Sequence, residues 1–224
     1  MSIFDLFFEL LRVSLGEISK LFHTPDDKEW EQLYQMAEKQ SLIGVTFAGV
    51  QRLHNQNQIP PELLLMRWYG MANIIRNRNQ QINLQCASLS KDFKEAGFQS
   101  CILKGQGVAT LYGELRAYRS PGDIDIWVDG DRDKALDFAR QQGAEVSYID
   151  SVHAHADFFS DTQVEVHSRP SWMYNTKCDQ AFINYWSSCK EEQFSHYNEN
   201  LGFCYPTVAF NIVYSLLHIN RHIF

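Results

Sequence analysis

The sequence predicts an α+β fold: a small mixed sheet with helices on one face, flanked by helical segments at the N- and C-terminal ends. Two observations predict this class. Apolar residues recur at helical spacing before residue 96 and after residue 170. Between these limits, short apolar or alternating runs typical of strands are separated by helical patterns. We therefore expect three segments, residues 1–96, 97–170 and 171–224, with the sheet in the middle one.

The N-terminal segment is expected to consist of helices. Trp30, Leu33 and Tyr34 belong to an apolar set at helical spacing. A proline pair then opens a long helical pattern over residues 62–94, because proline is tolerated in the first turn of a helix. The segment shows no grouping of side chains that indicates chemistry, so we expect it to act as a helical layer.

The middle segment contains the strand patterns. Strands are expected over 99–103, 123–128, 152–159 and 163–167, with helices after the first strand and over 134–142. The last two strands are separated by Ser160-Asp161-Thr162, which is typical of a hairpin turn. After Pro170 the chain returns to helical patterns.

The composition excludes several kinds of partner. The 224 residues carry a formal net charge of −7, whereas duplex DNA requires clustered Lys and Arg, so no such partner is expected. No apolar run approaches the roughly 18 residues of a membrane span, so no membrane association is expected. The five cysteines are scattered and odd in number, which argues against a disulfide framework. We expect reduced thiols and a cytoplasmic protein.

Three carboxylates form the candidate catalytic and metal site. Asp123 and Asp125 lie two apart on a predicted strand, so their side chains share one face. Glu165 has the same alternation in Val164-Glu165-Val166 and supplies a third acid. Like charges held together require a cation, and Mg²⁺ prefers carboxylate oxygens. Such a cluster holds two metal ions about 4 Å apart and is typical of phosphoryl or nucleotidyl transfer.

Basic and glycine residues near the strands are candidates for phosphate binding. Lys104, Gly105 and Gln106 lie between the first strand and its helix, where glycine lets the backbone approach a phosphate. Lys104 adds a positive charge. Arg119, four residues before Asp123, is placed either to meet a triphosphate or to pair with an acid of the cluster.

The histidines near these acids have two interpretations each. His153 and His155 alternate on one strand face with Asp157, which is the geometry of a transition-metal site, but such a pair is more often part of an ordinary polar face. His167 lies two residues after Glu165 and shares its face. It is expected either to orient Glu165 or contact substrate, or to be a hydrogen-bonded structural histidine.

The motifs together resemble a known family. Leu103-Lys104-Gly105, then Arg119-x-x-x-Asp123-Ile124-Asp125, then Val164-Glu165-Val166-His167 are similar to an uncharacterised bacterial nucleotidyltransferase family of the polymerase-beta-like nucleotidyltransferase superfamily. The resemblance covers mainly residues 102–167. The usual Gly-Ser after the first strand is replaced here by Lys104-Gly105-Gln106.

The resemblance implies a nucleotidyltransferase-type sheet with metal ions on the two aspartates and the third acid. It implies Mg²⁺ or Mn²⁺ as cofactor and a nucleoside triphosphate (NTP) as substrate. The nucleoside monophosphate (NMP) would be moved to an unidentified acceptor, either a small molecule, a protein or an RNA end. Chains of this family tend to continue beyond the equivalent of residue 224, so we expect a truncated chain.

The same motifs also fit other functions. The altered glycine motif suits a catalytically silent nucleotide-binding module, or a toxin/antitoxin-type interaction module with the same fold. Abortive-infection toxin-type nucleotidyltransferases share the Arg-x-x-x-Asp-x-Asp arrangement. The same acids also suit a metal-dependent phosphodiesterase, in which water replaces the acceptor hydroxyl.

Overall fold

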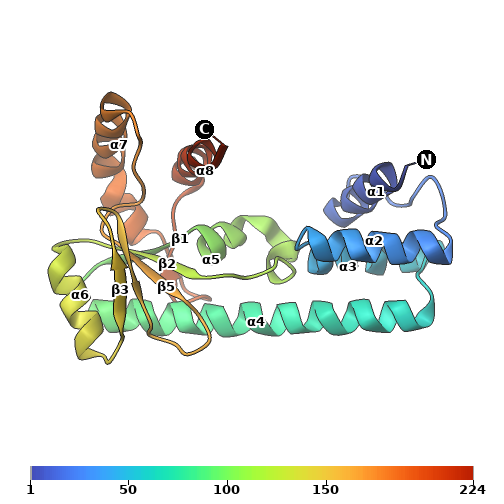
Figure 1. The fold of residues 1–224 in the computed structure, drawn as a ribbon, viewed down its shortest axis with the longest axis horizontal. Coiled ribbons are helices and arrows are strands. Elements are labelled where there is room, and N and C mark those ends of the chain that lie inside the picture. Colours follow the sequence, from blue (N-terminus) through green and yellow to red (C-terminus); the bar gives the residue numbers. More distant parts are fainter. Residues whose placement is uncertain (1, 224) are drawn as a thin grey trace. The chain divides into compact units, whose positions relative to one another are not determined.

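The computed structural model describes the backbone of residues 2–223 and all of their side chains except those of 148, 149 and 221–223. It confirms a mixed α+β fold (Figure 1). The chain forms two compact units. The helical unit comprises residues up to 80 together with 112–121, and the sheet unit comprises 81–111 and residues from 122 onward. The long helix α4 (Glu62–Glu95) contributes its first part to the helical unit and its second part to the sheet unit.

The helical unit is built from short amphipathic helices. Besides the first part of α4, it contains α1 (Ile3–Leu15), α2 (Asp27–Lys39), α3 (Ile43–Leu53), the 3₁₀ turn η1 (His54–Gln56) and most of the 3₁₀ segment η2 (Thr110–Ala117). Ser2 and Asp26 begin α1 and α2 with capping boxes, which satisfy amide groups that the first helical turn leaves unpaired. Trp30 and Trp68 pack edge to face in the core, and Trp68 donates to the carbonyl of Ile43 at 3.0 Å.

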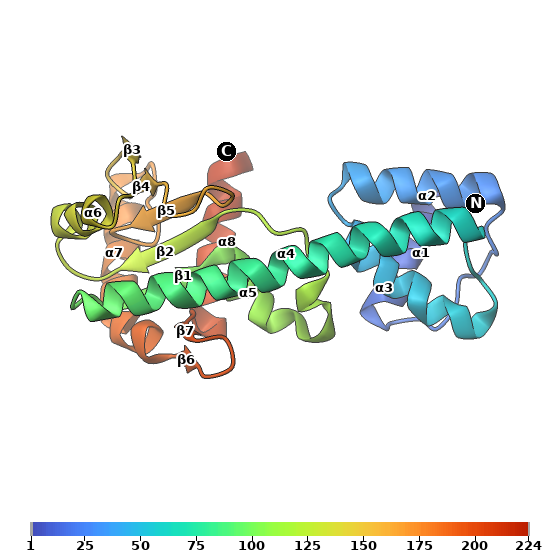
Figure 2. The ribbon, with the colours of Figure 1, turned by 90° about the horizontal axis from the view of Figure 1, so that it is seen from below.

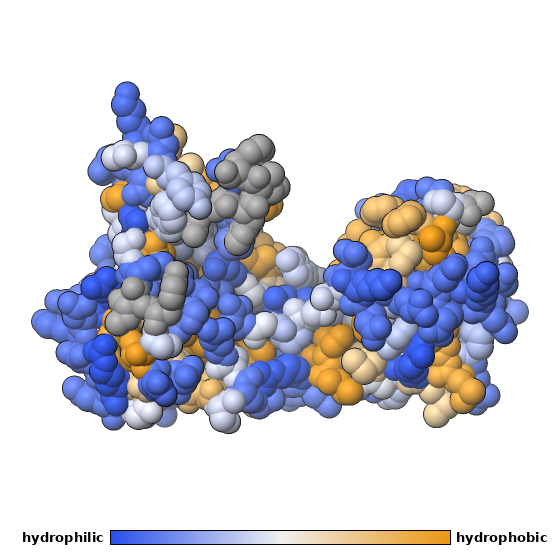
Figure 3. Space-filling model, in the orientation of Figure 1, coloured by the Kyte–Doolittle hydropathy of each residue, from blue (hydrophilic) through white to orange (hydrophobic). Residues whose placement is uncertain are grey.

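Among the residues whose side chains are described, the helical unit contains no group of three or more potential metal ligands, although His23 pairs with Glu29 at 2.8 Å. Its α1 helix leaves Phe4 and Phe8 exposed, and hydrophobic patches are visible on this unit in Figure 3.

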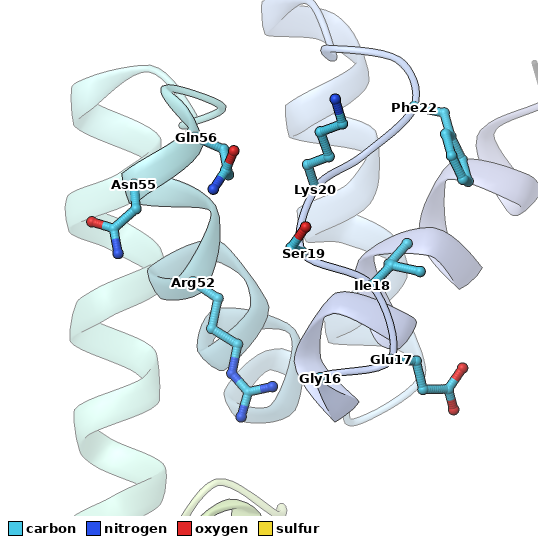
Figure 4. A pocket seen from close by; sticks show the side chains of 9 residues that line it. All are labelled: Gly16, Glu17, Ile18, Ser19, Lys20, Phe22, Arg52, Asn55 and Gln56. Atoms are coloured by element: carbon cyan, nitrogen blue, oxygen red, sulfur yellow. The ribbon is translucent and has the colours of Figure 1, made fainter.

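A cavity of about 730 Å³ is lined by the loop after α1 and by the end of α3 (Figure 4). Arg52, which lines this cavity, donates a hydrogen bond to the backbone carbonyl oxygen of Val13 at 3.2 Å.

The sheet unit contains a five-stranded sheet in the order β1-β2-β5-β4-β3. The strands are β1 (Ser100–Leu103), β2 (Ile124–Val128), β3 (Val146–Ile149), β4 (His153–Ala156) and β5 (Val164–His167). β2 and β5 are parallel, and the other neighbouring pairs are antiparallel. The expected hairpin is confirmed as β4–β5, whereas the edge strand β3 was absent from the sequence prediction. A separate two-stranded sheet joins β6 (Tyr197–Asn198) to β7 (Phe203–Cys204).

Helices flank both faces of this sheet. Its helices are the second part of α4, the short α5 (Lys104–Ala109), α6 (Arg132–Gln141), α7 (Thr176–Ser195) and α8 (Val208–Ile223). The second part of α4 and α6 pack on the face that presents Ile102, Ile124 and Ile126. The opposite face, where Trp127 points, is covered by α7 and α8 (Figures 1 and 2). The C-terminal helices thus complete a second apolar layer, in addition to the single helical face expected from the sequence.

The turn after β1 is tight because α5 begins immediately at Lys104. A methyl group at Gly107 would overlap the backbone carbonyl of Ile102, so only glycine fits there without a shift of the chain. This close approach fixes where the residues after β1 lie relative to the strand. Within the described part of the chain, no helix has the length and apolar character needed to cross a membrane.

Candidate active site

The strand register places the predicted acids side by side. Asp125 of β2 is paired directly with Glu165 of β5 in the parallel ladder. Side chains at directly paired positions point to the same face, so both carboxylates project from one face of the sheet. Leu103 lies opposite Asp125 on β1, and His155 lies opposite Glu165 on β4. The polar side chains therefore form one row across the middle of the sheet.

Asp125 is a buried carboxylate in contact with two basic side chains. It is 2% exposed. The Nζ of Lys104 lies 2.7 Å from its Oδ1, and the Nε2 of His167 lies 2.9 Å from the same atom. Burial favours the neutral carboxyl, but the hydrogen bond and charge of His167, followed by those of Lys104, outweigh burial. They hold the pKa of Asp125 well below its usual value, so this group is an anion at neutral pH.

His167 bridges the two strand carboxylates. Its Nε2 lies 3.3 Å from Oε2 of Glu165 as well as 2.9 Å from Asp125. Burial would lower the pKa of His167, but hydrogen bonds to Asp125 and Glu165 outweigh it and raise the pKa. The Nδ1 atom is buried and makes no hydrogen bond to the described residues. His167 therefore acts on this cluster through Nε2, in line with the sequence hypothesis that it orients Glu165.

Glu165 is surrounded by imidazoles. Besides His167, the Nε2 atoms of His155 and His153 lie 3.5 and 3.9 Å from its carboxylate oxygens. The hydrogen bond from His167 is the largest effect on Glu165, and it lowers the pKa of this carboxyl despite partial burial. Burial also lowers the pKa of His153, against the opposing charge of Glu165. The carboxylate of Glu165 therefore has the imidazole nitrogens of three histidines beside it.

Asp123 lies one residue before β2 and is the most exposed of the three acids. Desolvation by the surrounding protein raises its pKa, and the charges of Asp125 and Glu165 raise it further. The attraction of Lys104 opposes this only weakly. The outer side of the cluster therefore has an excess of negative charge that a bound cation would relieve.

The predicted phosphate-binding residues lie in different surroundings. Lys104 has a left-handed backbone with φ of 38°, an uncommon conformation for a residue with a side chain, and its ammonium reaches Asp125. Gly105 has φ and ψ of 19° and −105°, outside helical values. Gln106 is 4% exposed and donates to Asn83 of α4 at 2.7 Å. Arg119 belongs to the helical unit, where its carbonyl accepts from Asn79 at 2.7 Å.

Several partners of the cluster were missed by sequence reasoning. The contact between Lys104 and Asp125 depends on the unusual backbone at Lys104, for which no sequence signal exists. Asp150 and Gln163, which contact the outer nitrogens of His153 and His155, lie in loops beside the strands. Asp150 is fixed by a local turn in which its Oδ1 accepts from the amides of Val152 and His153, whereas the position of Gln163 follows from the pairing of β4 with β5.

Two groups of side chains bring together atoms of the kind that ligate metals. Asp125, Glu165 and His167 form one group, and His153, His155 and Glu165 form the other. Within each group, the ligand atoms lie within 4.8 Å of one another. Carboxylate oxygens suit Mg²⁺ and Mn²⁺, whereas imidazole nitrogens favour transition metals. The arrangement therefore offers two candidate positions for a divalent cation.

Comparison with known proteins assigns the chain to a family. A family model described as uncharacterised nucleotidyltransferase matches residues 26–224. No curated protein and no solved structure matches the chain. The family match includes the whole five-stranded sheet and all the acids described above. The chain belongs to the family of uncharacterised nucleotidyltransferases.

Proposed function

We propose that the protein transfers an NMP from an NTP to an acceptor, with release of pyrophosphate, at Asp123, Asp125 and Glu165. Membership of a nucleotidyltransferase family supports the reaction class. The observation that supports the site most directly is the paired position of Asp125 and Glu165 on neighbouring parallel strands. The proposal includes the polymerase-beta-like type of active site that the motifs resemble.

The side chains fit a hard divalent cation. The donor atoms are carboxylate oxygens from three separate backbone positions, which is the ligand type that Mg²⁺ and Mn²⁺ prefer. The raised pKa of Asp123 reflects desolvation first, then repulsion from Asp125 and Glu165, and a cation beside Asp123 would remove this repulsion. We assign Asp123, Asp125 and Glu165 as the ligands.

In this proposal the protein supplies position and charge. Bound Mg²⁺ or Mn²⁺ would neutralise phosphate charge and favour ionisation of the acceptor hydroxyl. His167 fixes Asp125 and Glu165 through Nε2, so their oxygens are oriented before substrate arrives. Lys104 places positive charge beside the cluster, where it is available to a triphosphate. Gly105 completes the proposed contacts to the phosphates in the sheet unit, whereas the buried Gln106 donates to Asn83 and Arg119 belongs to the helical unit, so neither is assigned a phosphate.

A catalytically silent nucleotide-binding module is the second candidate. It is favoured by Lys104 and His167, because both already contact Oδ1 of Asp125 and offset its charge without a metal ion. In such a module the nucleotide would bind without turnover. The two candidates differ in whether pyrophosphate is released when NTP and metal are supplied together.

Transfer and hydrolysis are distinguished by the fate of the label. The protein would be incubated with each NTP labelled at the α-phosphate, with Mg²⁺ or Mn²⁺, and with separate pools of small molecules, proteins and RNA. We expect label to become attached to components of one pool, with loss of the signal when the metal is chelated. Release of free NMP in every pool would instead indicate a phosphodiesterase, and unchanged NTP would indicate the silent module.

We further propose that the protein acts in the cytoplasm, where NTPs are abundant. All five cysteines are free thiols, and two of them, Cys86 and Cys101, are buried. Burial raises the pKa of both thiols, so neither is a reactive thiolate. Thiols in this state suit a reducing compartment.

A further inference from the structure

The strand β4 presents two histidines beside Glu165 that the proposed transfer reaction does not use. His153 and His155 alternate along β4, so both side chains project from the carboxylate-bearing face. Their rings stack with centroids 5.6 Å apart, and His153 stacks in turn on His167 at 5.1 Å. We infer that His153, His155 and Glu165 form a second metal site, selective for a borderline transition-metal ion such as Zn²⁺.

The distances fit a tetrahedral ion. Zinc bonds to nitrogen and oxygen of about 2.0–2.2 Å place the ligand atoms of a tetrahedron about 3.3–3.6 Å apart. The Nε2 of His155 lies 3.5 Å from Oε1 of Glu165, and the Nε2 of His153 lies 3.9 Å from Oε2. All three ligand atoms lie within 4.8 Å of one another. The His155–Glu165 separation already matches a zinc ion, and rotation of the imidazoles and the carboxylate would have to bring the other ligand atoms, which lie within 4.8 Å, closer together.

The outer nitrogens of both imidazoles have polar neighbours suited to orienting them. Oδ1 of Asp150 lies 3.5 Å from Nδ1 of His153 and is itself fixed by the amides of Val152 and His153. The side-chain amide of Gln163 lies 2.8 Å from Nδ1 of His155, and a half-turn of this amide presents its oxygen there. A carboxylate or amide oxygen behind each imidazole is the usual support for a metal-binding histidine. The positions of Asp150 and Gln163 therefore match a metal-binding arrangement.

The donor set separates this site from the proposed magnesium site. Two imidazoles and one carboxylate form the set found in zinc sites that keep a fourth position open for water or substrate. Mg²⁺ prefers oxygen donors and is not expected to compete at the imidazoles. Glu165 is common to both sites, so zinc would withdraw a ligand from the magnesium cluster. That consequence, inhibition by zinc, rests on the proposed function, whereas zinc binding itself does not.

Calorimetric titration with Zn²⁺ alone, without nucleotide, tests the inference. We expect one zinc ion per wild-type chain and an affinity lowered at least about tenfold in His153→Gln and His155→Gln, because even changes behind a ligand cost 10–100-fold. His54→Gln is the matched control, since His54 is exposed in the helical unit. Asp123→Asn should bind zinc as the wild type does, although it should lose NTP turnover.

Ring-nitrogen NMR spectra of the wild type during the same titration avoid any dependence on folding of the variants. We expect zinc to shift the Nε2 signals of His153 and His155 first. Equal zinc binding by wild type, His153→Gln and His155→Gln would overturn the inference, as would zinc-induced shifts confined to other histidines. Loss of NTP binding in the Asp123→Asn variant with retained zinc binding would support a zinc site that shares Glu165 with the magnesium cluster but does not use Asp123.

Discussion

Asp123→Asn is expected to lower metal-dependent NTP turnover by about 10²–10³-fold, the range seen when one group that stabilises transition-state charge is removed. The asparagine keeps the size of the side chain but loses the negative charge that we assign to metal binding. Asp123 precedes β2 and is exposed, so the substitution removes little packing. Pyrophosphate release with Mg²⁺ and Mn²⁺ measures the effect.

The melting temperature of Asp123→Asn shows whether a loss of turnover comes from a loss of folding. The charges of Asp125 and Glu165 disfavour ionised Asp123, so removal of its charge should leave the melting temperature equal or slightly higher. Retained turnover in a folded Asp123→Asn protein would refute the assignment of Asp123 as a metal ligand. A large drop in melting temperature would show that Asp123 has a structural role instead.

Asp125→Ala is expected to destabilise the fold by about 3 kcal/mol, because removal of one partner from a buried ion pair leaves the other charge uncompensated. Asp125 is 2% exposed, and His167 beside it is 3% exposed. Without the aspartate, the ammonium of Lys104 loses its carboxylate partner, and His167 keeps only Glu165 beside its Nε2. Urea denaturation of both proteins measures the difference in free energy of unfolding.

Asp137→Ala is the matched control for this prediction. Arg140 lies 2.7 Å from Asp137, the same separation as Lys104 from Asp125, but both side chains of that pair are exposed. Exposed pairs are screened by water, so this change should cost less than about 1 kcal/mol. Similar losses for the two variants would contradict the claim that burial makes the Asp125 cluster a structural element. Adding His167→Gln to Asp125→Ala should recover part of the loss, because it removes the uncompensated cation.

The sequence predicts best which side chains share a strand face, because this follows from the alternation of neighbouring residues. The spacing of Asp123 and Asp125 predicted one shared face, and the valines around Glu165 predicted the face of its strand. The structure brings Asp125 and Glu165 together as expected. The hairpin of β4 and β5 was also predictable, since its turn residues lie between two alternating runs.

The features of the fold and the site that the sequence does not predict depend on contacts between distant parts of the chain. The edge strand β3, Val146–Ile149, follows closely on α6, so its pattern is not separated from the connecting segment. The parallel pairing of β2 with β5 joins strands that are far apart in the sequence, and no local pattern predicts it. The left-handed backbone of Lys104 and its contact with Asp125 likewise arise only in the folded chain.

The C-terminal helices illustrate the same limit. An apolar stripe predicted a helix there, but not that α7 and α8 would cover the second face of the sheet around Trp127. Trp127 alternates with Ile126 along β2, so one of the two had to point away from the layer formed by α4. A bulky apolar side chain on that second face requires cover, which these helices supply.

Calorimetric titration of each of the four NTPs into the wild-type protein, with and without Mg²⁺ or Mn²⁺, tests the central claim most directly. We expect at least one NTP to bind in a way that requires the metal and is lost in Asp123→Asn. A folded wild-type protein that binds no NTP, or one that binds equally well without metal and in the variant, would contradict the assignment of these carboxylates as the nucleotidyltransferase site.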